Sequence, residues 1–266
     1  MNVVVTTARK RADKLEPLAR VVAEELHVAY QKRNDRSVDD LLEEVKTDLL
    51  VVARHRLSLY RHGDPNPFFY HPNAAQVRAK AFFANGYDAF IEACDLQKGN
   101  SLLDCTLGLG ADAVMAKLAV GQDGYVTGIE QNAIMAYIVK KGLHTWTDAH
   151  PMLLDAMQSV HVLAGHHYDL LKSLPDSSYD VIYFDPMFEQ TIHSSSGIQA
   201  LKSFAHYEAL SQQTIQEAMR VAKKRVVLKD HWTSSLFEEL GFHVNRRRPV
   251  EFQYGIKKTE WNDKIK

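Results

Sequence analysis

The pattern of apolar and polar positions changes character near Pro72. Before this point, strand-length apolar runs are mixed with a helical pattern over residues 11–27 and a short helix that Ser37 is expected to cap. The strands expected here cover residues 3–5, 49–53, 57–60 and 68–70. We therefore expect a small α/β subdomain over residues 1–72, with no function evident in its pattern.

From Asn73 onward, strand-length apolar runs alternate with helix-length amphipathic runs, which predicts a parallel sheet with helices on both faces. Helices are expected over residues 73–84, 87–94 and between the strands, including a long one over 198–221. The predicted strands cover residues 101–105, 125–129, 160–164, 181–184 and 225–229. A helix near residues 234–240 and two β-type runs, 242–248 and 250–256, follow. A tight turn at Pro249 would join these runs, so they predict an antiparallel hairpin. Residues 73–266 form the second predicted domain.

Composition excludes several classes of protein. With 45% hydrophobic and 24% charged residues in 266, the chain has the make-up of a globular protein and not of a disordered or fibrous one. No run approaches the roughly 18 apolar residues of a membrane span, and the first residues lack the layout of a secretion signal. We therefore expect a cytoplasmic protein without a membrane partner.

Charge and metal-binding residue types narrow the picture further. The formal net charge is −1, which excludes a uniformly basic protein that coats nucleic acid. Local basic groups remain, and each is either part of an RNA-binding face or solvated surface: residues 9–11, 32–36, 54–61, 223–225 and 246–248. The thirteen histidines show no metal-ligand spacing, so no metal site is expected. Cys94 and Cys105 lie in apolar surroundings and are expected to be buried, inert thiols.

The first motif with chemical content is Asp104-Cys-Thr-Leu-Gly-Leu-Gly-Ala-Asp112, between a predicted strand and a predicted helix. Gly108 and Gly110 would let a ligand approach the backbone at a helix N-terminus. Glu130, at the end of the next strand, is spaced to accept hydrogen bonds from both hydroxyls of a ribose. Asp104 would repel a pyrophosphate but suits a cationic amine and sulfonium, so the motif favours S-adenosylmethionine over a dinucleotide. The alternative for Asp104 is a turn-forming residue.

The second motif, Asp185-Pro-Met-Phe188, follows the predicted strand that ends at Phe184. Together with residues 103–113 and 224–229, it resembles class I S-adenosylmethionine-dependent methyltransferases that modify exocyclic amines. More closely, it resembles the small-subunit ribosomal RNA guanine-N2 methyltransferases, whose signature reads D-P-M-F. The resemblance covers roughly residues 73–256. It implies a Rossmann-like α/β fold whose mostly parallel seven-stranded sheet ends in the antiparallel hairpin.

The resemblance also implies a reaction. S-adenosyl-L-methionine would donate a methyl group, leaving S-adenosyl-L-homocysteine. The receiving amine is a poor nucleophile, because its lone pair is delocalised into the base. Asp185 and the Pro186 carbonyl would each accept one N–H and localise that lone pair, and Phe188 would stack on the extruded base. An Asp-Pro turn that merely ends a strand is the alternative. Glu189 stands where the family usually has proline.

Cofactor contacts follow from the same resemblance. Asp112 is expected at the methionine end, Glu130 at the ribose, Gln131 at the adenine edge, and His166 with His167 near the adenine. Asp169 competes with these histidines for the adenine amine, and either histidine alternatively faces solvent. The complete expected cofactor set is Asp104, Thr106, Gly108, Gly110, Ala111, Asp112, Glu130, Gln131, His166, His167 and Asp185.

The leading hypothesis is methyl transfer to an exocyclic nucleobase amine, guanine N2 in ribosomal RNA, with the N-terminal subdomain contacting RNA phosphates. One alternative is a methyltransferase of a small molecule or a protein. Another is a noncatalytic RNA-binding protein that keeps a nucleoside pocket. Two further features stay open: residues 190–197 are either a lid or a surface loop, and Lys229 faces target phosphates or anchors the sheet edge.

Overall fold

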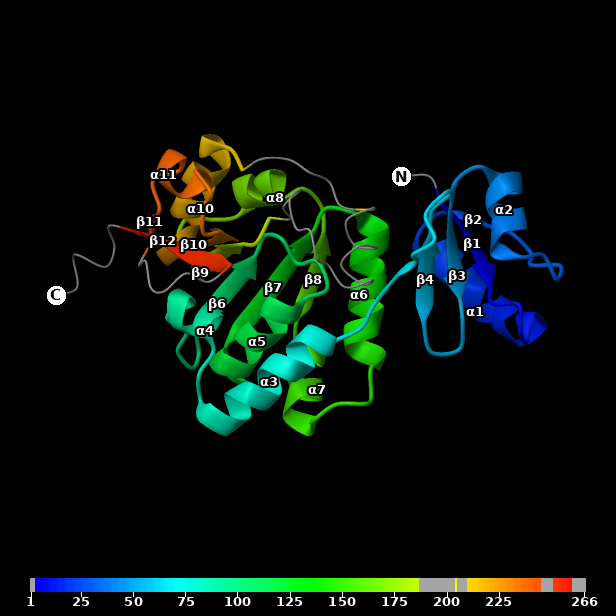
Figure 1. Cartoon of the computed structure of the whole chain (residues 1–266), viewed down its shortest axis with the longest axis horizontal. Helices are drawn as coiled ribbons and strands as arrows, with labels where there is room; N and C mark the ends of the chain where they lie inside the picture. The colour runs from blue at the N-terminus through cyan, green and yellow to red at the C-terminus, as the bar shows by residue number, and fades with distance from the viewer. Residues whose placement is uncertain (1–2, 187–203, 205–209, 245–250, 260–266) are drawn as a thin grey trace. The chain divides into compact units, whose positions relative to one another are not determined.

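The computed structural model describes residues 3–186, 204, 210–244 and 251–259 (Figure 1). Contacts divide the chain into two units. The first unit comprises the described residues of 1–71, 137–145 and 189–205. The second comprises those of 72–136, 146–188 and 206–266. None of the described helices combines the length and apolar character needed to cross a lipid bilayer.

The first unit contains a five-stranded sheet in the order β2-β1-β3-β4-β5. Strand β1 runs parallel to β2 and β3, whereas β4 is antiparallel to both β3 and β5. The strands are β1 (Val3–Thr7), β2 (Ala29–Tyr30), β3 (Asp48–Val52), β4 (Leu57–Tyr60) and β5 (Phe68–Phe69). Helices α1 (Ala12–Glu25) and α2 (Val38–Val45) pack on β1 and β3. Sequence analysis missed β2, because two residues carry no periodicity.

Helix α2 begins where the sequence predicts. The Ser37 side chain accepts a hydrogen bond from the Asp40 N–H, and the Asp40 carboxylate accepts one from the Ser37 N–H. This capping box satisfies two donors that the helix backbone cannot. Leu41 on α2 then packs against Leu49 in a small core of this unit.

The second unit contains a seven-stranded sheet in the order β11-β12-β10-β9-β6-β7-β8. The five strands from β10 to β8 are parallel, and β12 is antiparallel to both β10 and β11. The strands are β6 (Ser101–Asp104), β7 (Tyr125–Glu130), β8 (His161–Ala164), β9 (Tyr179–Phe184), β10 (Ala222–His231), β11 (His243–Val244) and β12 (Phe252–Lys258). The mostly parallel sheet and its antiparallel hairpin are therefore confirmed. The connection at residues 245–250, including Pro249, lies outside the described residues.

Helices cover both faces of this sheet (Figure 1). On one face α5 (Ala111–Val120) contacts α3 (Asn73–Asn85), α4 (Ala89–Cys94) and α7 (Pro151–Gln158). On the other face α10 (Gln212–Val221) contacts α8 (His167–Ser173), and α11 (Leu236–Glu239) contacts β10. Helix α6 (Ala133–Thr145) follows β7. Leu103 of β6 and Ile182 of β9 share a core cluster with Ile215 of α10, and burial on both faces explains the continuous apolar strands.

One expected helix is corrected by the structure. The predicted helix over 198–221 is not continuous: Phe204 is helical, Leu210 and Ser211 are not, and α10 begins at Gln212. The Ser211 side chain accepts a hydrogen bond from the Thr214 N–H at 3.1 Å and so caps α10. Residues 198–203 and 205–209 lie outside the described part of the chain. Cys94 and Cys105 are buried and unbridged as expected, and burial raises the pKa of both thiols.

Candidate active site

The parallel strands of the second unit end at one edge of the sheet, and acidic residues stand at three of these ends. Strand β6 ends at Asp104, β7 ends at Glu130, and Asp185 directly follows β9. Because β6 lies between β7 and β9, these positions are neighbours across the sheet. The carboxyl edge of a parallel sheet is where open α/β folds bind ligands.

The Thr106 hydroxyl connects the ends of β6 and β9. It accepts a hydrogen bond from the Asp185 backbone N–H at 2.6 Å and lies 3.4 Å from Asp104 Oδ1, to which it donates. The Thr106 N–H also donates to Asp104 Oδ1, at 3.0 Å. The loop after β6 is therefore fastened to the residue that opens the second motif.

Two glycines shape the rest of this loop. Gly108 and Gly110 have φ values of 51° and 76°, in the left-handed region that other residues rarely adopt. Gly110 is the cap residue of α5 and offers no side chain to the first helical turn. The backbone N–H groups at Ala111 and Asp112 therefore begin a helix with its positive end beside the loop.

Asp112, in the first turn of α5, is held by side chains from two other elements. Arg78 of α3 donates to Asp112 Oδ1 at 2.5 Å, and the Tyr183 hydroxyl of β9 donates to Oδ2 at 3.0 Å. The same guanidinium donates through two nitrogens to Asp88, the cap residue of α4, each at 2.9 Å. Arg78 thus fixes the start of α5 against the start of α4, with charge-assisted bonds in a buried setting.

Lys229 of β10 links Asp112 to Asp185. Its Nζ donates to Asp185 Oδ2 at 2.6 Å and lies 3.9 Å from Asp112 Oδ2. Burial disfavours the ammonium, but Asp112 and Asp185 outweigh this and raise the pKa of Lys229. The lysine therefore points at the two carboxylates at this edge of the sheet.

The three clustered carboxyls differ in acidity because their partners differ. Asp104 is 1% exposed and faces Asp112, and burial with this repulsion raises its pKa to about 8. Burial raises the pKa of Asp185 to about 6, although Lys229 opposes the rise. For Asp112, Lys229 and Arg78 overcome burial and lower the pKa. At neutral pH the free protein thus holds Asp104 protonated and Asp112 ionised.

Glu130 stands apart from this cluster with its own hydrogen-bond set. Its Oε1 accepts from the Asn132 N–H at 2.9 Å, and the N–H groups of Gly108 and Gln131 also lower its pKa. Burial prevails, however, and raises the pKa of Glu130 to about 6. Contact with the Gly108 backbone joins this carboxyl to the glycine loop, and Gln131 follows it in the turn after β7.

The two histidines after β8 have structural contacts of their own. His166 caps α8, and its Nδ1 accepts the Tyr168 N–H at 3.2 Å. The His166 and His167 rings stack with centroids 4.6 Å apart, and His167 meets Phe184 edge-on. Gly165, just before them, donates its N–H to the Glu130 carbonyl, so this turn lies beside the end of β7. Asp169 lies in the first turn of α8.

Phe188 and the segment 190–197 lie outside the described residues, whereas Pro186 is described and half-buried. Sequence reasoning missed Arg78, Asp88 and Tyr183. An arginine amid the apolar residues of α3 was the one available signal, since burial requires a partner for such a charge.

The arrangement suits a cationic nucleoside. The buried Asp104 carboxyl at a strand end matches a cationic group of such a ligand, the start of α5 matches a carboxylate, and Glu130 matches ribose hydroxyls. In the part of the chain that the structure describes, no group of three His, Cys, Asp or Glu side chains is arranged to hold a metal ion.

Comparisons with known proteins agree with this chemistry. The family model described as “Putative SAM-dependent methyltransferase”, where SAM is S-adenosylmethionine, matches residues 37–245. The “Uncharacterized protein YpiP” of Bacillus subtilis is 41% identical over 256 residues, which are 96% of this chain and 99% of that protein.

More distant relatives carry a functional name. Ribosomal RNA small subunit methyltransferase J of Thioalkalivibrio sulfidiphilus is 32% identical over 135 residues, 48% of this chain and 51% of that enzyme. The enzyme of the same name from Buchnera aphidicola is 29% identical over 132 residues, 48% of this chain and 51% of its own length. The chain thus spans about half the length of each of these two relatives.

A solved structure supports the fold alone. The SAM-dependent methyltransferase from Neisseria gonorrhoeae superposes with a TM-score of 0.57 at 15% identity, covering 98% of this chain and 96% of that one. With the family model matching well over half of the residues, the chain belongs to the S-adenosylmethionine-dependent methyltransferases and uses S-adenosylmethionine as its cofactor.

Proposed function

We propose that the protein methylates the exocyclic amine of a nucleobase in RNA, with guanine N2 of small-subunit ribosomal RNA as the target. The observation that carries this proposal is the set of hydrogen bonds around Asp185. Its Oδ2 is bound by Lys229, its backbone N–H is bound by Thr106, and no described residue donates to its Oδ1. As far as the described residues show, one carboxylate oxygen is therefore oriented and available to accept an N–H from a substrate.

Residues at this strand end supply what amine methylation requires. S-adenosylmethionine supplies, when bound, a methyl group on a positively charged sulfur. Asp185 Oδ1 and the Pro186 carbonyl accept the two N–H groups of the amine, which concentrates its lone pair on nitrogen. The cofactor would give its methyl group to the amine nitrogen and keep the electron pair of the broken carbon–sulfur bond. The amine then loses one proton to Asp185.

The raised pKa of Asp185 suits this last role. A carboxyl with a pKa of about 6 accepts a proton more readily than an ordinary aspartate, yet it is mostly ionised at neutral pH. Lys229 keeps it ionised before the reaction, because its ammonium lies 2.6 Å from Oδ2. Lys229 is thus a positioning residue in this proposal.

RNA as the substrate rests on the relatives and on charge. Two relatives are named as ribosomal RNA methyltransferases, and the first unit carries basic clusters at residues 9–11 and 32–36. Lysine and arginine on such a unit would contact phosphates and position the RNA. A ribosomal RNA target puts the reaction in the cytoplasm, with RNA as partner. Phe188 remains the proposed stacking residue for the base.

The test is methyl transfer from labelled S-adenosylmethionine to ribosomal RNA that lacks the modification, followed by digestion to nucleosides. We expect the label in N2-methylguanosine. Asp185→Asn should lower the rate by about 100-fold or more, because its amide cannot take the proton. Its dissociation constant for S-adenosylmethionine should stay within about threefold.

Glu130→Gln should do the opposite, weakening cofactor affinity by about tenfold through the lost ribose hydrogen bonds. Asp180→Asn is the matched control, since Asp180 lies at the other end of β9, where it accepts hydrogen bonds from Ser101. Label on a small molecule or a protein, with none on RNA, would reject RNA as the substrate. Equal loss of rate and cofactor affinity in Asp185→Asn would assign Asp185 to cofactor binding.

A further inference from the structure

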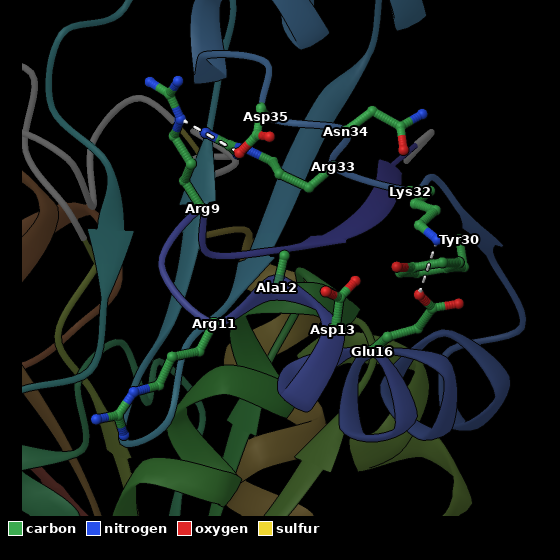
Figure 2. Close-up of a pocket in the computed structure, with 10 residues that line it drawn as sticks. All are labelled: Arg9, Arg11, Ala12, Asp13, Glu16, Tyr30, Lys32, Arg33, Asn34 and Asp35. Atoms are coloured by element: carbon green, nitrogen blue, oxygen red, sulfur yellow. Dashed lines mark ion pairs between the residues drawn. The ribbon is translucent and has the colours of Figure 1, made fainter.

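The first unit has a cavity of about 320 Å³ that the methyl-transfer reaction does not use (Figure 2). It lies where β1 gives way to the loop before α1 and where β2 gives way to residues 31–35. Its wall includes four cations, Arg9, Arg11, Lys32 and Arg33. A cavity beyond the carboxyl ends of two parallel strands is the usual location of a ligand in an α/β sheet.

Arg33 is the most unusual residue of this cavity. It is 5% exposed, and its Nε and one terminal nitrogen are buried without a hydrogen-bond partner among the described residues. Burial, with Arg9 and Arg36 nearby, lowers the pKa of this guanidinium. Leaving charged donors unpaired in a buried setting is costly, so an anion beside this guanidinium would stabilise it. In Figure 2 the Arg33 side chain extends from the loop after β2 toward the side of the cavity where Arg9 lies.

The start of α1 adds backbone donors to the same wall. Ala12 and Asp13 line the cavity, and the cap residue Arg11 makes no side-chain hydrogen bond to the first turn. The N–H groups of Lys14 and Leu15 both donate hydrogen bonds to the Arg11 carbonyl. The N–H groups of Ala12 and Asp13 are therefore the ones that the helix leaves free, at its positive end.

The acidic residues of the wall are mostly engaged. Asp35 lies 3.8 Å from Arg9, and Glu16 pairs with Arg20 at 2.6 Å and with Lys32 at 3.9 Å. Arg11 and Arg33 make no ion pair with any described residue. Counting Asp13 as the third carboxylate of the wall, four cations face three carboxylates, so the surplus charge of the cavity is one positive charge.

We propose that this cavity binds a phosphate group, with Arg33 as its buried anchor and the start of α1 as its backbone cradle. Guanidinium groups match phosphate with paired hydrogen bonds, and a helix N-terminus suits the same anion. The phosphate belongs to a free nucleotide or to an RNA strand, and both present the same chemistry to these donors. The proposal stands on the first unit alone and does not depend on the methyl-transfer reaction.

The first experiment measures thermal stability of the whole chain with inorganic phosphate against chloride at equal ionic strength. We expect phosphate to raise the melting temperature as its concentration rises. Arg33→Met should weaken phosphate binding by at least about tenfold, and the exposed Arg11→Gln by several-fold. Lys10→Gln is the control, because Lys10 adjoins Arg11 without lining the cavity, and it should behave like the unchanged chain.

The outcomes separate clearly. An equal phosphate effect in the unchanged chain and in Arg33→Met, or no effect in either, overturns the site. If Arg33→Met folds poorly, Arg11→Gln alone decides, since its side chain is exposed. The affinity for S-adenosylmethionine is measured on the same samples to show whether the second unit is intact. A failure of the phosphate site can then be distinguished from a failure of the proposed function.

A second experiment identifies the source of the phosphate by competition with labelled ligands. Its probes are guanosine 5′-monophosphate, a 5′-phosphorylated oligoribonucleotide and the same strand with a 5′-hydroxyl. Competition by the first two alone assigns a terminal phosphate, and competition by both strands assigns a backbone phosphate. Failure of all three to compete with inorganic phosphate overturns the nucleotide or RNA as the source.

Discussion

Asp104 and Asp112 lie in one buried cluster, yet their pKa values shift in opposite directions. Asp112 has Arg78, Tyr183 and Lys229 around it, so its charged form is stabilised. Asp104 is buried beside the Asp112 carboxylate, and both effects favour its neutral form, although the two donors from Thr106 oppose the rise in pKa. A neutral acid at this strand end can ionise when a cation arrives, and therefore suits a ligand that brings positive charge.

Replacing Asp104 by asparagine should reveal the raised pKa of Asp104 through the pH dependence of the unfolding free energy. Its pKa is about 8 when folded against 3.8 ordinarily, so the folded state holds more protons between these values and stability falls as pH rises. Asp104→Asn lacks this loss. The unfolding free energy of Asp104→Asn, relative to that of the unchanged chain, should rise by more than about 1.4 kcal/mol, the equivalent of one pKa unit, between about pH 4 and about pH 8. Above about pH 8 the difference should stay constant. Denaturant unfolding across pH measures it.

Asp180→Asn is the comparison, because the pKa of Asp180 is shifted in the opposite direction. Although burial opposes it, hydrogen bonds from Ser101 lower the pKa of Asp180, so its contribution to stability is present above its ordinary pKa and lost below. This variant should therefore be destabilised at neutral pH and approach the unchanged chain in acid. A pH-independent difference for Asp104→Asn would contradict the raised pKa.

At the scale of single residues, the sequence alone led to the acidic strand ends but not to their partners. Asp104, Glu130 and Asp185 each follow a recognisable apolar run, which explains why they could be predicted. Arg78 meets Asp112 across 34 positions of sequence, and Tyr183 meets it across 71. Such pairings depend on how α3 and β9 pack around α5, which local pattern does not encode.

At the scale of elements, β7 and the glycine loop are fitted together at Gly128. A Cβ at this position would overlap the Leu107 side chain, with Leu107 Cγ only 2.9 Å away. Leu107 is itself buried and donates its N–H to the Ile129 carbonyl. The absence of a side chain at Gly128 thus allows the cofactor loop to lie directly on the strand.

Gly128→Ala should therefore cost about 1–3 kcal/mol of unfolding free energy and displace the loop, because the core has no room for the added methyl group. We expect weaker S-adenosylmethionine affinity as well, by about tenfold. Gly255→Ala is the matched control, since its Cβ would meet Phe237 at 2.5 Å and Phe242 at 2.8 Å, away from the cofactor loop. It should lose stability and keep its cofactor affinity. Equal affinity losses in both variants would reject the local explanation.

Element prediction succeeded where periodicity was strong and failed where capping decided the boundary. The parallel strands follow from continuous apolar runs, because helices cover both faces of the sheet. The start of α10 was misplaced because apolar periodicity continues through Leu210, whereas the Ser211 side chain caps the first turn of a helix that begins at Gln212. Likewise, Leu18 and Val21 of α1 are 46% and 49% exposed despite their helical spacing, since Ala19, Val22 and Ala23 form the buried face.

At the scale of the whole molecule, a net charge of −1 leaves RNA binding to local basic groups. Binding of the full chain to its RNA should therefore weaken with salt, by at least about tenfold between roughly 50 and 200 mM, as released counterions dictate. S-adenosylmethionine affinity should change far less, because its expected partners are buried and little screened. Filter binding at several salt concentrations measures the slope. An RNA affinity that is flat across this range would contradict phosphate recognition.

The Thr106 hydroxyl has a single proton, so its hydrogen bonds to the ends of β6 and β9 cannot change independently. That proton goes to Asp104, while the oxygen receives the amide that precedes Pro186. If Asp104 moves when S-adenosylmethionine binds, Thr106 moves with it, and so does the backbone at Asp185, where the substrate amine is proposed to bind. Because such linkage is reciprocal, the donor should change the affinity for the acceptor by the same factor by which the acceptor changes the affinity for the donor.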